Sequence, residues 1–244
     1  NGTDGFLTVA TGQGKSTLIQ GPIVANLAAG IDSIGVTLVP TKCLADDQAR
    51  SATAKGIRAL ALHEDTIREA RESSPSRDLF EEVARGEWSL IFLGPEMIMS
   101  PQFEKLLRRQ TFITRFRYFT VDEVHLLEDW NDFRDSFKHV FHLRNRFLDS
   151  VVWLALSATV VKGKETRKIK EMLGFGPDTQ TVHLPVDRPS ITYVTRFIKH
   201  SFSGDNFLDV AWVIPQNARR PSDIPITVIF VEHIDVGNRI DNFL

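Results

Sequence analysis

Residues 6–16 read FLTVATGQGKS, and this stretch decides the fold that the sequence predicts. The apolar run 6–10 is predicted to be a strand, and residues 16–27 the helix that follows it. Between them, Gly12 and Gly14 permit a tight turn whose backbone N–H groups point toward one anion. The positive N-terminal end of the helix adds to that attraction. Strand, glycine turn and helix in this order therefore predict a phosphate-binding loop.

The loop also carries side chains suited to a nucleoside triphosphate. Lys15 is expected to reach the β- and γ-phosphates, and the Ser16 hydroxyl to bind Mg²⁺. The general pattern has another glycine five residues before Gly14, where this chain has Val9. For the loop taken alone, a chance glycine turn therefore stays open as an alternative. The predicted nucleotide-binding residues are Thr11, Gly12, Gln13, Gly14, Lys15, Ser16 and Thr17.

Short apolar runs alternate with longer amphipathic stretches along the chain, which is the pattern of a parallel sheet covered by helices. The α/β fold class follows from this alternation. Further strands are predicted at residues 34–39, 57–62, 89–93, 118–121 and 152–156, and further helices at 41–55 and 79–85.

The last quarter of the chain has a different character. Residues 188–225 contain Gly204 and several prolines, and only residues 226–231 read as a further strong strand. One strand and part of a helix cannot bury a core of their own. We therefore expect a first domain over residues 1–184, and a linker with the incomplete start of a second domain over 185–244.

Composition excludes several classes of protein. The 244 residues carry a net charge of −2, so contacts with a phosphate backbone must come from local patches. Cys43 is the single cysteine, which excludes a disulfide framework or a cysteine zinc cluster within these residues. No apolar run is long enough for a membrane span, and the first residues do not resemble a secretory signal. We expect an intracellular protein without a membrane partner.

An acidic pair follows the predicted strand 118–121. Asp122 is expected to hold Mg²⁺ beside Ser16, and Glu123 to orient and deprotonate the attacking water. Ligand chemistry in open parallel sheets lies at strand ends, where this pair stands. An acidic helix cap is the alternative for an isolated pair.

Ser157-Ala158-Thr159 follows the predicted strand 152–156 in the same way. The hydroxyls of Ser157 and Thr159 are predicted to couple the acidic pair to a neighbouring element. A plain helix cap is the alternative for this segment taken singly. The order of all three segments along the chain favours the functional interpretation.

Together these segments resemble the motifs of superfamily 2 helicases of the DEAD/DEAH type, and of the RecQ family in particular. Residues 10–16 resemble motif I, residues 39–44 with Gln48 motif Ia, residues 122–125 motif II in a DEVH form, and residues 157–159 motif III. Gly94-Pro95-Glu96 matches the family's Thr/Ser-Pro-Glu element only in its last two residues. Residues 187–191 resemble the element that opens the family's second RecA-like domain, and 226–231 would then be motif IV.

The most family-specific segment is Trp130-Asn131-Asp132-Phe133-Arg134, which is similar to the RecQ aromatic-rich loop but one residue shorter. In that family the loop senses single-stranded DNA, a role that the resemblance gives to Trp130, Phe133 and Arg134. Because Trp130, Phe133, Phe137 and Val140 recur at helical spacing, a core stripe is the alternative. Pro40, Thr41, Pro95 and Glu96 are further nucleic-acid candidates, and His125 of the DEVH motif joins Lys15, Asp122 and Glu123 as a catalytic candidate.

The resemblance implies a RecA-like parallel sheet flanked by helices, as in P-loop NTPases, followed by the truncated start of a second RecA-like domain. It also implies an ATP-dependent DNA helicase with ATP and Mg²⁺ as cofactors. By the same resemblance the enzyme translocates 3′ to 5′ on single-stranded and forked DNA, in repair or recombination in the nucleus. The arginines of motifs V and VI fall outside this chain, so we expect slow hydrolysis by the chain alone.

Three other functions stay open from the sequence. An RNA helicase shares the general motifs, although the DEVH form and the aromatic loop argue against it. A degenerate module that only binds nucleic acid would not need Lys15, Asp122 and Glu123 together. A P-loop kinase leaves the Ser-Ala-Thr segment unexplained.

Overall fold

The computed structural model describes residues 2–126, 134–147, 151–160, 162–201 and 204–244, with side chains of residues 134–139 not included. Two compact units are present, Asn1–Asp187 and Arg188–Leu244, and each is described by itself. That the second unit opens another RecA-like domain stays a prediction.

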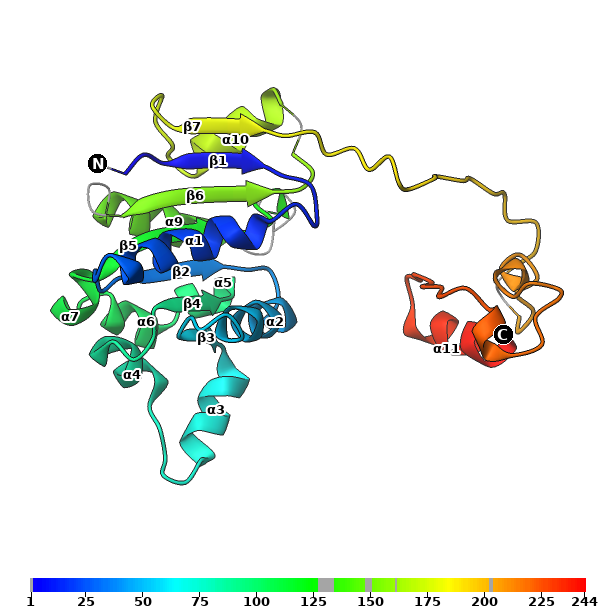
Figure 1. Ribbon diagram of the computed structural model, residues 1–244, viewed down its shortest axis with the longest axis horizontal. Helices are drawn as coiled ribbons and strands as arrows, with labels where there is room; N and C mark the ends of the chain where they lie inside the picture. Colours follow the sequence, from blue (N-terminus) through cyan, green and yellow to red (C-terminus); the bar gives the residue numbers. More distant parts are fainter. Residues whose placement is uncertain (1, 127–133, 148–150, 161, 202–203) are drawn as a thin grey trace. The chain divides into compact units, whose positions relative to one another are not determined.

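A seven-stranded, all-parallel sheet runs through the described part of the first unit. Its strand order is β3-β4-β2-β5-β6-β1-β7 (Figure 1). The strands are β1 (Gly5–Thr8), β2 (Ile34–Leu38), β3 (Ala59–Leu62), β4 (Leu90–Leu93), β5 (Phe116–Val121), β6 (Val152–Ser157) and β7 (Gln180–His183). The first six confirm the predicted strands to within two residues at each end, whereas β7 was not predicted.

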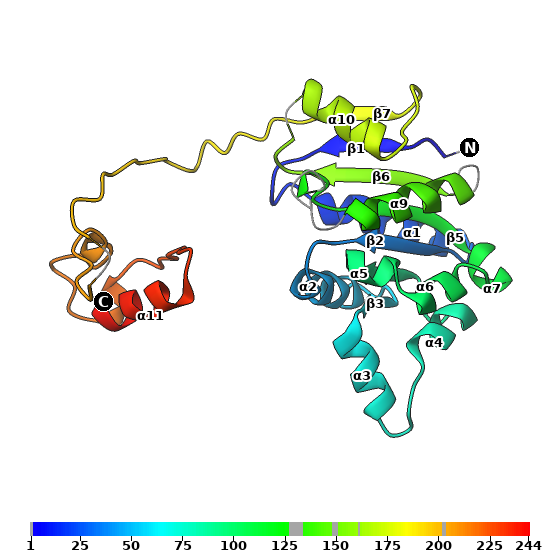
Figure 2. The same cartoon turned by 180° about the vertical axis from the view of Figure 1, so that it is seen from behind.

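Helices cover both faces of this sheet (Figures 1 and 2). Helices α1 (Lys15–Ala28) and α2 (Lys42–Thr53) pack on one face, through Ile19 and Ile23 of α1 and small alanines of α2. On the other face lie α4 (Leu79–Arg85), α5 (Pro95–Ile98), α6 (Pro101–Leu106), α7 (Gln110–Ile113), α9 (Arg134–Arg146) and α10 (Lys164–Met172). Helix α3 (Glu64–Glu72) follows β3. The predicted helices are confirmed as α1, α2 and α4.

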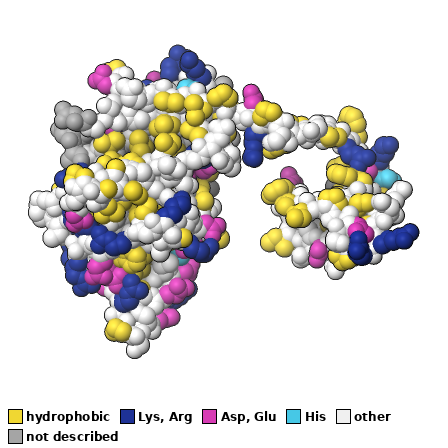
Figure 3. Space-filling model, in the orientation of Figure 1, with side chains coloured by type: hydrophobic (Ala, Val, Ile, Leu, Met, Phe, Trp, Pro, Cys, Tyr) yellow, Lys and Arg dark blue, Asp and Glu magenta, His cyan; other side chains and the backbone are white. Residues whose placement is uncertain are grey.

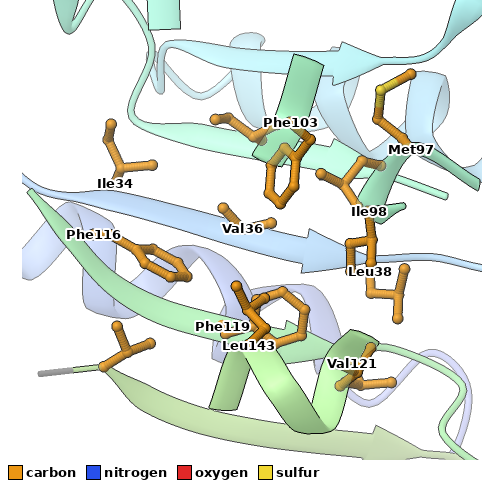
Figure 4. Packing of buried hydrophobic residues seen from close by; sticks show 14 of the residues in the cluster. Ile34, Val36, Leu38, Met97, Ile98, Phe103, Phe116, Phe119, Val121 and Leu143 are labelled. Carbon is orange, nitrogen blue, oxygen red and sulfur yellow. The ribbon is translucent and has the colours of Figure 1, made fainter. Parts of the chain in front are cut away.

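The larger core lies between the sheet and the second group of helices. Phe116, Phe119 and Trp153 are at most 1% exposed, and the rings of Phe119 and Trp153 have centroids 4.3 Å apart. Figure 4 shows side chains of β2 and β5 meeting Phe103 and Leu143 from the helices. Because both faces of the central strands are buried, their sequences read as continuous apolar runs.

The face that α1 and α2 cover extends beyond these helices over β6, β1 and β7. Leu7, Leu154 and Val182 fall on this face by the strand register, and all three are partly or fully exposed. Figure 3 shows hydrophobic side chains gathered over this part of the sheet. The core of the first unit is thus thinner at this end of the sheet than under β2, β4 and β5.

The second unit contains short helical segments but no strand among residues 188–201 and 204–244. It has η2 (Ala211–Val213), η3 (Pro221–Asp223) and α11 (Ile234–Phe243). The predicted strand 226–231 is wrong: Ile226 and Phe230 are exposed and the segment pairs with no other part of the described chain. Its β-branched residues favour extended backbone, but a strand forms only against a neighbour.

None of the helices in the described ranges is long and apolar enough to cross a membrane.

Candidate active site

The glycine turn lies between β1 and α1 as predicted. Gly12 has φ 84° and Gly14 φ 88°, in the left-handed region that glycine adopts without strain. Gly14 is also the N-cap of α1, so the turn passes directly into the positive end of that helix. Val9 is 3% exposed and donates its N–H to Ser157 O at 2.9 Å. Val9, at the position where the general pattern has a glycine, is therefore bonded to β6 and lies before the turn.

Lys15 and Glu123 form an ion pair across the carboxyl edge of the sheet, the edge at which the parallel strands end. Lys15 Nζ lies 2.6 Å from Glu123 Oε1, although 108 residues separate them in sequence. The side chains are only 12% and 25% exposed. The lysine of the glycine turn and the second residue of the acidic pair are thus in direct contact.

Asp122 is buried directly after β5. Its N–H donates to Leu38 O at 2.9 Å, and its Oδ1 accepts the N–H of Glu123 at 3.0 Å. Its Oδ2 accepts a bond of 2.8 Å from Gln48 Nε2. Burial raises the pKa of the Asp122 carboxyl above its usual range, and the bond from Gln48 opposes that shift.

Glu123 is held in an unusual backbone conformation. Its φ is 49°, which is uncommon for a residue with a side chain, and residues in such sparsely populated regions cluster at active sites. Its Oε2 is buried and accepts no hydrogen bond from the described residues, while His125 Nδ1 lies 3.5 Å from it. This carboxylate therefore has one oxygen committed to Lys15 and one available.

His125 joins the acidic segment to the Ser-Ala-Thr segment. His125 Nδ1 and Ser157 Oγ are 3.0 Å apart. Ser157 is fully buried, and its Oγ also accepts the N–H groups of Thr159 and Val160 at 3.1 and 3.3 Å. The Thr159 side chain is exposed, so the contact with the acidic segment passes through Ser157.

The residues present fit Mg²⁺. Hydroxyl and carboxylate oxygens are its preferred ligands, and Ser16 and Asp122 supply them. The buried Oε2 of Glu123, the residue after Asp122, accepts no hydrogen bond from the described residues. Within the described ranges no three His, Cys, Asp or Glu side chains form a metal cluster. Most ligands of an ion here would be phosphate oxygens and waters, as is usual for Mg²⁺.

The predicted nucleic-acid residues fall into two groups. Thr41 is exposed and caps α2, its Oγ1 accepting the N–H of Leu44 at 3.2 Å. Pro95 is buried at the start of α5, whereas Glu96 beside it is exposed and Pro40 partly so. Trp130 and Phe133 lie outside the described residues, and Arg134 begins α9 with its side chain outside them. Val140 of the alternative core stripe is buried.

Gln48 is a site residue that the sequence did not identify. It entered the resemblance only as part of motif Ia, with no role given to its side chain. The structure places it against Asp122, 74 residues away in sequence. No local pattern signals such a contact, because it depends on how α2 packs beside the end of β5.

Residues 1–167 match the family model of the DEAD/DEAH box helicase. The chain belongs to the DEAD/DEAH box helicase family. This match covers the phosphate loop, the acidic segment and the Ser-Ala-Thr segment, which confirms the predicted family.

Within this family the protein is similar to RecQ-type members. It is 25% identical to the ATP-dependent DNA helicase RecQ of Haemophilus influenzae over 79% of this chain and 29% of that protein. It is 30% identical to the ATP-dependent helicase SGS1 of Saccharomyces cerevisiae over 65% of this chain and 11% of that protein. The chain thus spans less than a third of the length of these curated relatives.

Solved structures confirm the RecA-like fold of this DEAD/DEAH box protein. The DEAD-box helicase Mss116 bound to single-stranded RNA superposes with a TM-score of 0.58 at 16% identity. The superposition covers 78% of this chain and 38% of Mss116.

Proposed function

We propose that this chain is the nucleotide-binding part of an ATP-dependent DNA helicase of RecQ type. The observation that carries the proposal is the Lys15–Glu123 ion pair at the carboxyl edge. It brings a phosphate-binding amine and a water-activating carboxylate together at the end of a glycine turn. The similarity to RecQ and SGS1 supports DNA as the substrate.

Each residue of the site has a separate role in ATP hydrolysis. The N–H groups after Gly12 and Gly14 hold the phosphates, and the Lys15 amine moves from Glu123 to the β- and γ-phosphate oxygens. Ser16 and Asp122 would hold Mg²⁺, which would supply positive charge beside the phosphates when bound. Released from Lys15, Glu123 orients the attacking water and accepts its proton. Ser157, through its contact with His125, couples the acidic segment to the Ser-Ala-Thr segment.

The finer assignments belong to the same proposal. They are translocation from 3′ to 5′ on single-stranded DNA, unwinding of forked DNA in repair or recombination, and a nuclear location. Trp130, Phe133 and Arg134 are assigned the contact with single-stranded DNA. Removal of the Trp130 ring should weaken stimulation by DNA, since a ring stacks on bases of any sequence.

The experiment is nucleotide binding by this chain, measured with a fluorescent ATP analogue in the presence of Mg²⁺. Lys15→Ala should weaken binding about 10- to 100-fold, because a charge-assisted bond to phosphate is lost. Lys105→Ala, at an exposed position of α6, is the matched control. Equal binding by Lys15→Ala and the unaltered chain would refute the nucleotide site.

An RNA helicase is the second candidate, because the superposed Mss116 structure holds single-stranded RNA. Labelled single-stranded DNA and RNA of matched sequence distinguish the two. Tighter binding of DNA in the presence of nucleotide supports the RecQ-type proposal, and tighter binding of RNA supports the alternative.

A further inference from the structure

Gln48 lies in α2, the helix that follows Pro40 and Thr41. Its Nε2 donates a hydrogen bond of 2.8 Å to Oδ2 of Asp122, the carboxylate to which the proposed function assigns Mg²⁺. Oδ1 of the same carboxylate accepts the N–H of Glu123 at 3.0 Å. Two donors from different elements therefore fix the rotation of this carboxylate.

The Gln48 amide has a single favourable orientation. Its Oε1 is buried and has no hydrogen-bond partner among the described residues. Exchanging the two ends of the amide would place Oε1 against Oδ2 of Asp122, so that two acceptors would meet. A buried acceptor without a partner is unfavourable, and an apolar side chain here would avoid it. The bond to Asp122 is what the amide group contributes at this position.

Helix α2 is itself held firmly in place. Thr41 caps its first turn, and α2 contacts β3 and β4 of the sheet. The N–H of Asp122 donates to Leu38 O at 2.9 Å, and Leu38 ends β2, the strand that leads into α2. The buried residues through which α2 packs on the sheet are Ala45, Ala49 and Ala52. The carboxylate is thus tied to this part of the fold by its backbone and by its side chain.

We propose that Gln48 is a positioning residue, which holds the Asp122 carboxylate in the orientation that receives Mg²⁺ and so links metal binding to the position of α2. This inference rests on the proposed function, because it requires Asp122 to bind Mg²⁺ with the nucleotide. Gln48 acts through Asp122, as residues bonded to metal ligands do when they orient those ligands.

The test uses the 244-residue chain and a fluorescent ADP analogue, titrated at increasing Mg²⁺ concentration and separately in EDTA. Gln48→Met keeps a similar length without a donor, and Gln48→Ala removes the amide and most of the side chain. Both should raise the half-saturating Mg²⁺ concentration about 10- to 100-fold. Binding in EDTA and the thermal midpoint should stay close to those of the unaltered chain. Gln110→Met, at an exposed position of α7, is the control.

The outcomes separate this inference from the function on which it rests. A fall in affinity that is equal with Mg²⁺ and in EDTA overturns the positioning role and leaves the nucleotide site standing. So does a lower thermal midpoint with an unchanged Mg²⁺ requirement, which would indicate a structural role alone. If the unaltered chain binds no better with Mg²⁺ than without it, and Lys15→Ala binds as well, both proposals fall.

Discussion

The two edges of the sheet hold ion pairs of similar composition in different surroundings. At the amino edge, where the strands begin, Arg144 pairs with Asp4 and donates to Gly174 O at 2.9 Å. Its guanidinium also lies over the rings of Trp153 and Phe175, at 5.5 and 4.9 Å. At the carboxyl edge, the pair of Lys15 and Glu123 has a left-handed backbone and an unpartnered oxygen beside it.

The difference indicates what each pair is for. The amino-edge pair joins the start of β1, the start of β6 and the end of α10, so it holds these three elements together. The carboxyl-edge pair joins two groups to which the proposed function gives other partners, phosphate for Lys15 and water for Glu123. A close ion pair by itself therefore does not distinguish a stabilising contact from a catalytic one, and the surrounding contacts must decide.

The largest effect on stability is expected at the amino edge. Arg144→Met should lower the free energy of unfolding by about 3 kcal/mol, because the buried guanidinium loses its bonds to the half-buried Asp4 and to Gly174 O. Lys15→Met at the carboxyl edge should lower it far less while weakening nucleotide binding about 10- to 100-fold. Denaturant unfolding of both variants measures the contrast. Equal losses of stability would remove the distinction between the edges.

A smaller effect is expected at a second structural pair, between Arg77, which precedes α4, and Glu82 within it. The side-chain bond from Arg77 holds the pKa of the Glu82 carboxyl below its usual range, and Trp88 contributes a further bond. Glu82→Gln should lower the free energy of unfolding by about 1–3 kcal/mol at neutral pH. Because the folded pKa is depressed, this stabilisation is complete above the usual value near 4.5 and is lost as pH falls through the folded value. Unfolding curves at neutral and acid pH should show the two proteins converging in acid.

The smallest effect, with the opposite sign, is expected at Asp122. Its pKa is raised by burial, so the folded chain loses stability as pH rises through the folded pKa and the buried carboxylate ionises. Asp122→Asn removes that penalty and should stabilise the chain by on the order of 1 kcal/mol or less, while losing Mg²⁺-dependent nucleotide binding. Unfolding at increasing pH measures it: the advantage of the variant should grow with pH, and a constant or shrinking difference would contradict the assignment.

The sequence predicted the central strands of the sheet, but not the edge strand β7 or several of the short helices. The strands β2, β4 and β5 are buried on both faces, so their apolar runs stood out. β7 was missed because Gln180-Thr181-Val182-His183 is an exposed edge strand with no apolar run. The short helices that begin at Pro95 and Pro101 lack the length for a helical period, although proline at the first helical position marks such starts.

For the site, order along the chain was enough to place Lys15, Asp122 and Ser157 on one edge. Parallel strands end on the same side of their sheet, so residues that follow them converge there. The sequence could not predict which side chains contact one another at that edge. The contact of Gln48 with Asp122 depends on the packing of a helix, and the φ of Glu123 depends on neighbours that bond its backbone.

The position of β1 within the sheet has a consequence for synthesis. Gly5 of β1 lies opposite Leu154 of β6 and Gln180 of β7, so β1 pairs, among the described strands, with two that follow it by about 150 residues or more. Such long-range pairings form late, because the chain between them must be closed first. On the ribosome, the phosphate loop lacks its sheet neighbours until nearly the whole first unit has emerged. The phosphate loop therefore gains its sheet contacts only after the acidic segment and the Ser-Ala-Thr segment have been synthesised.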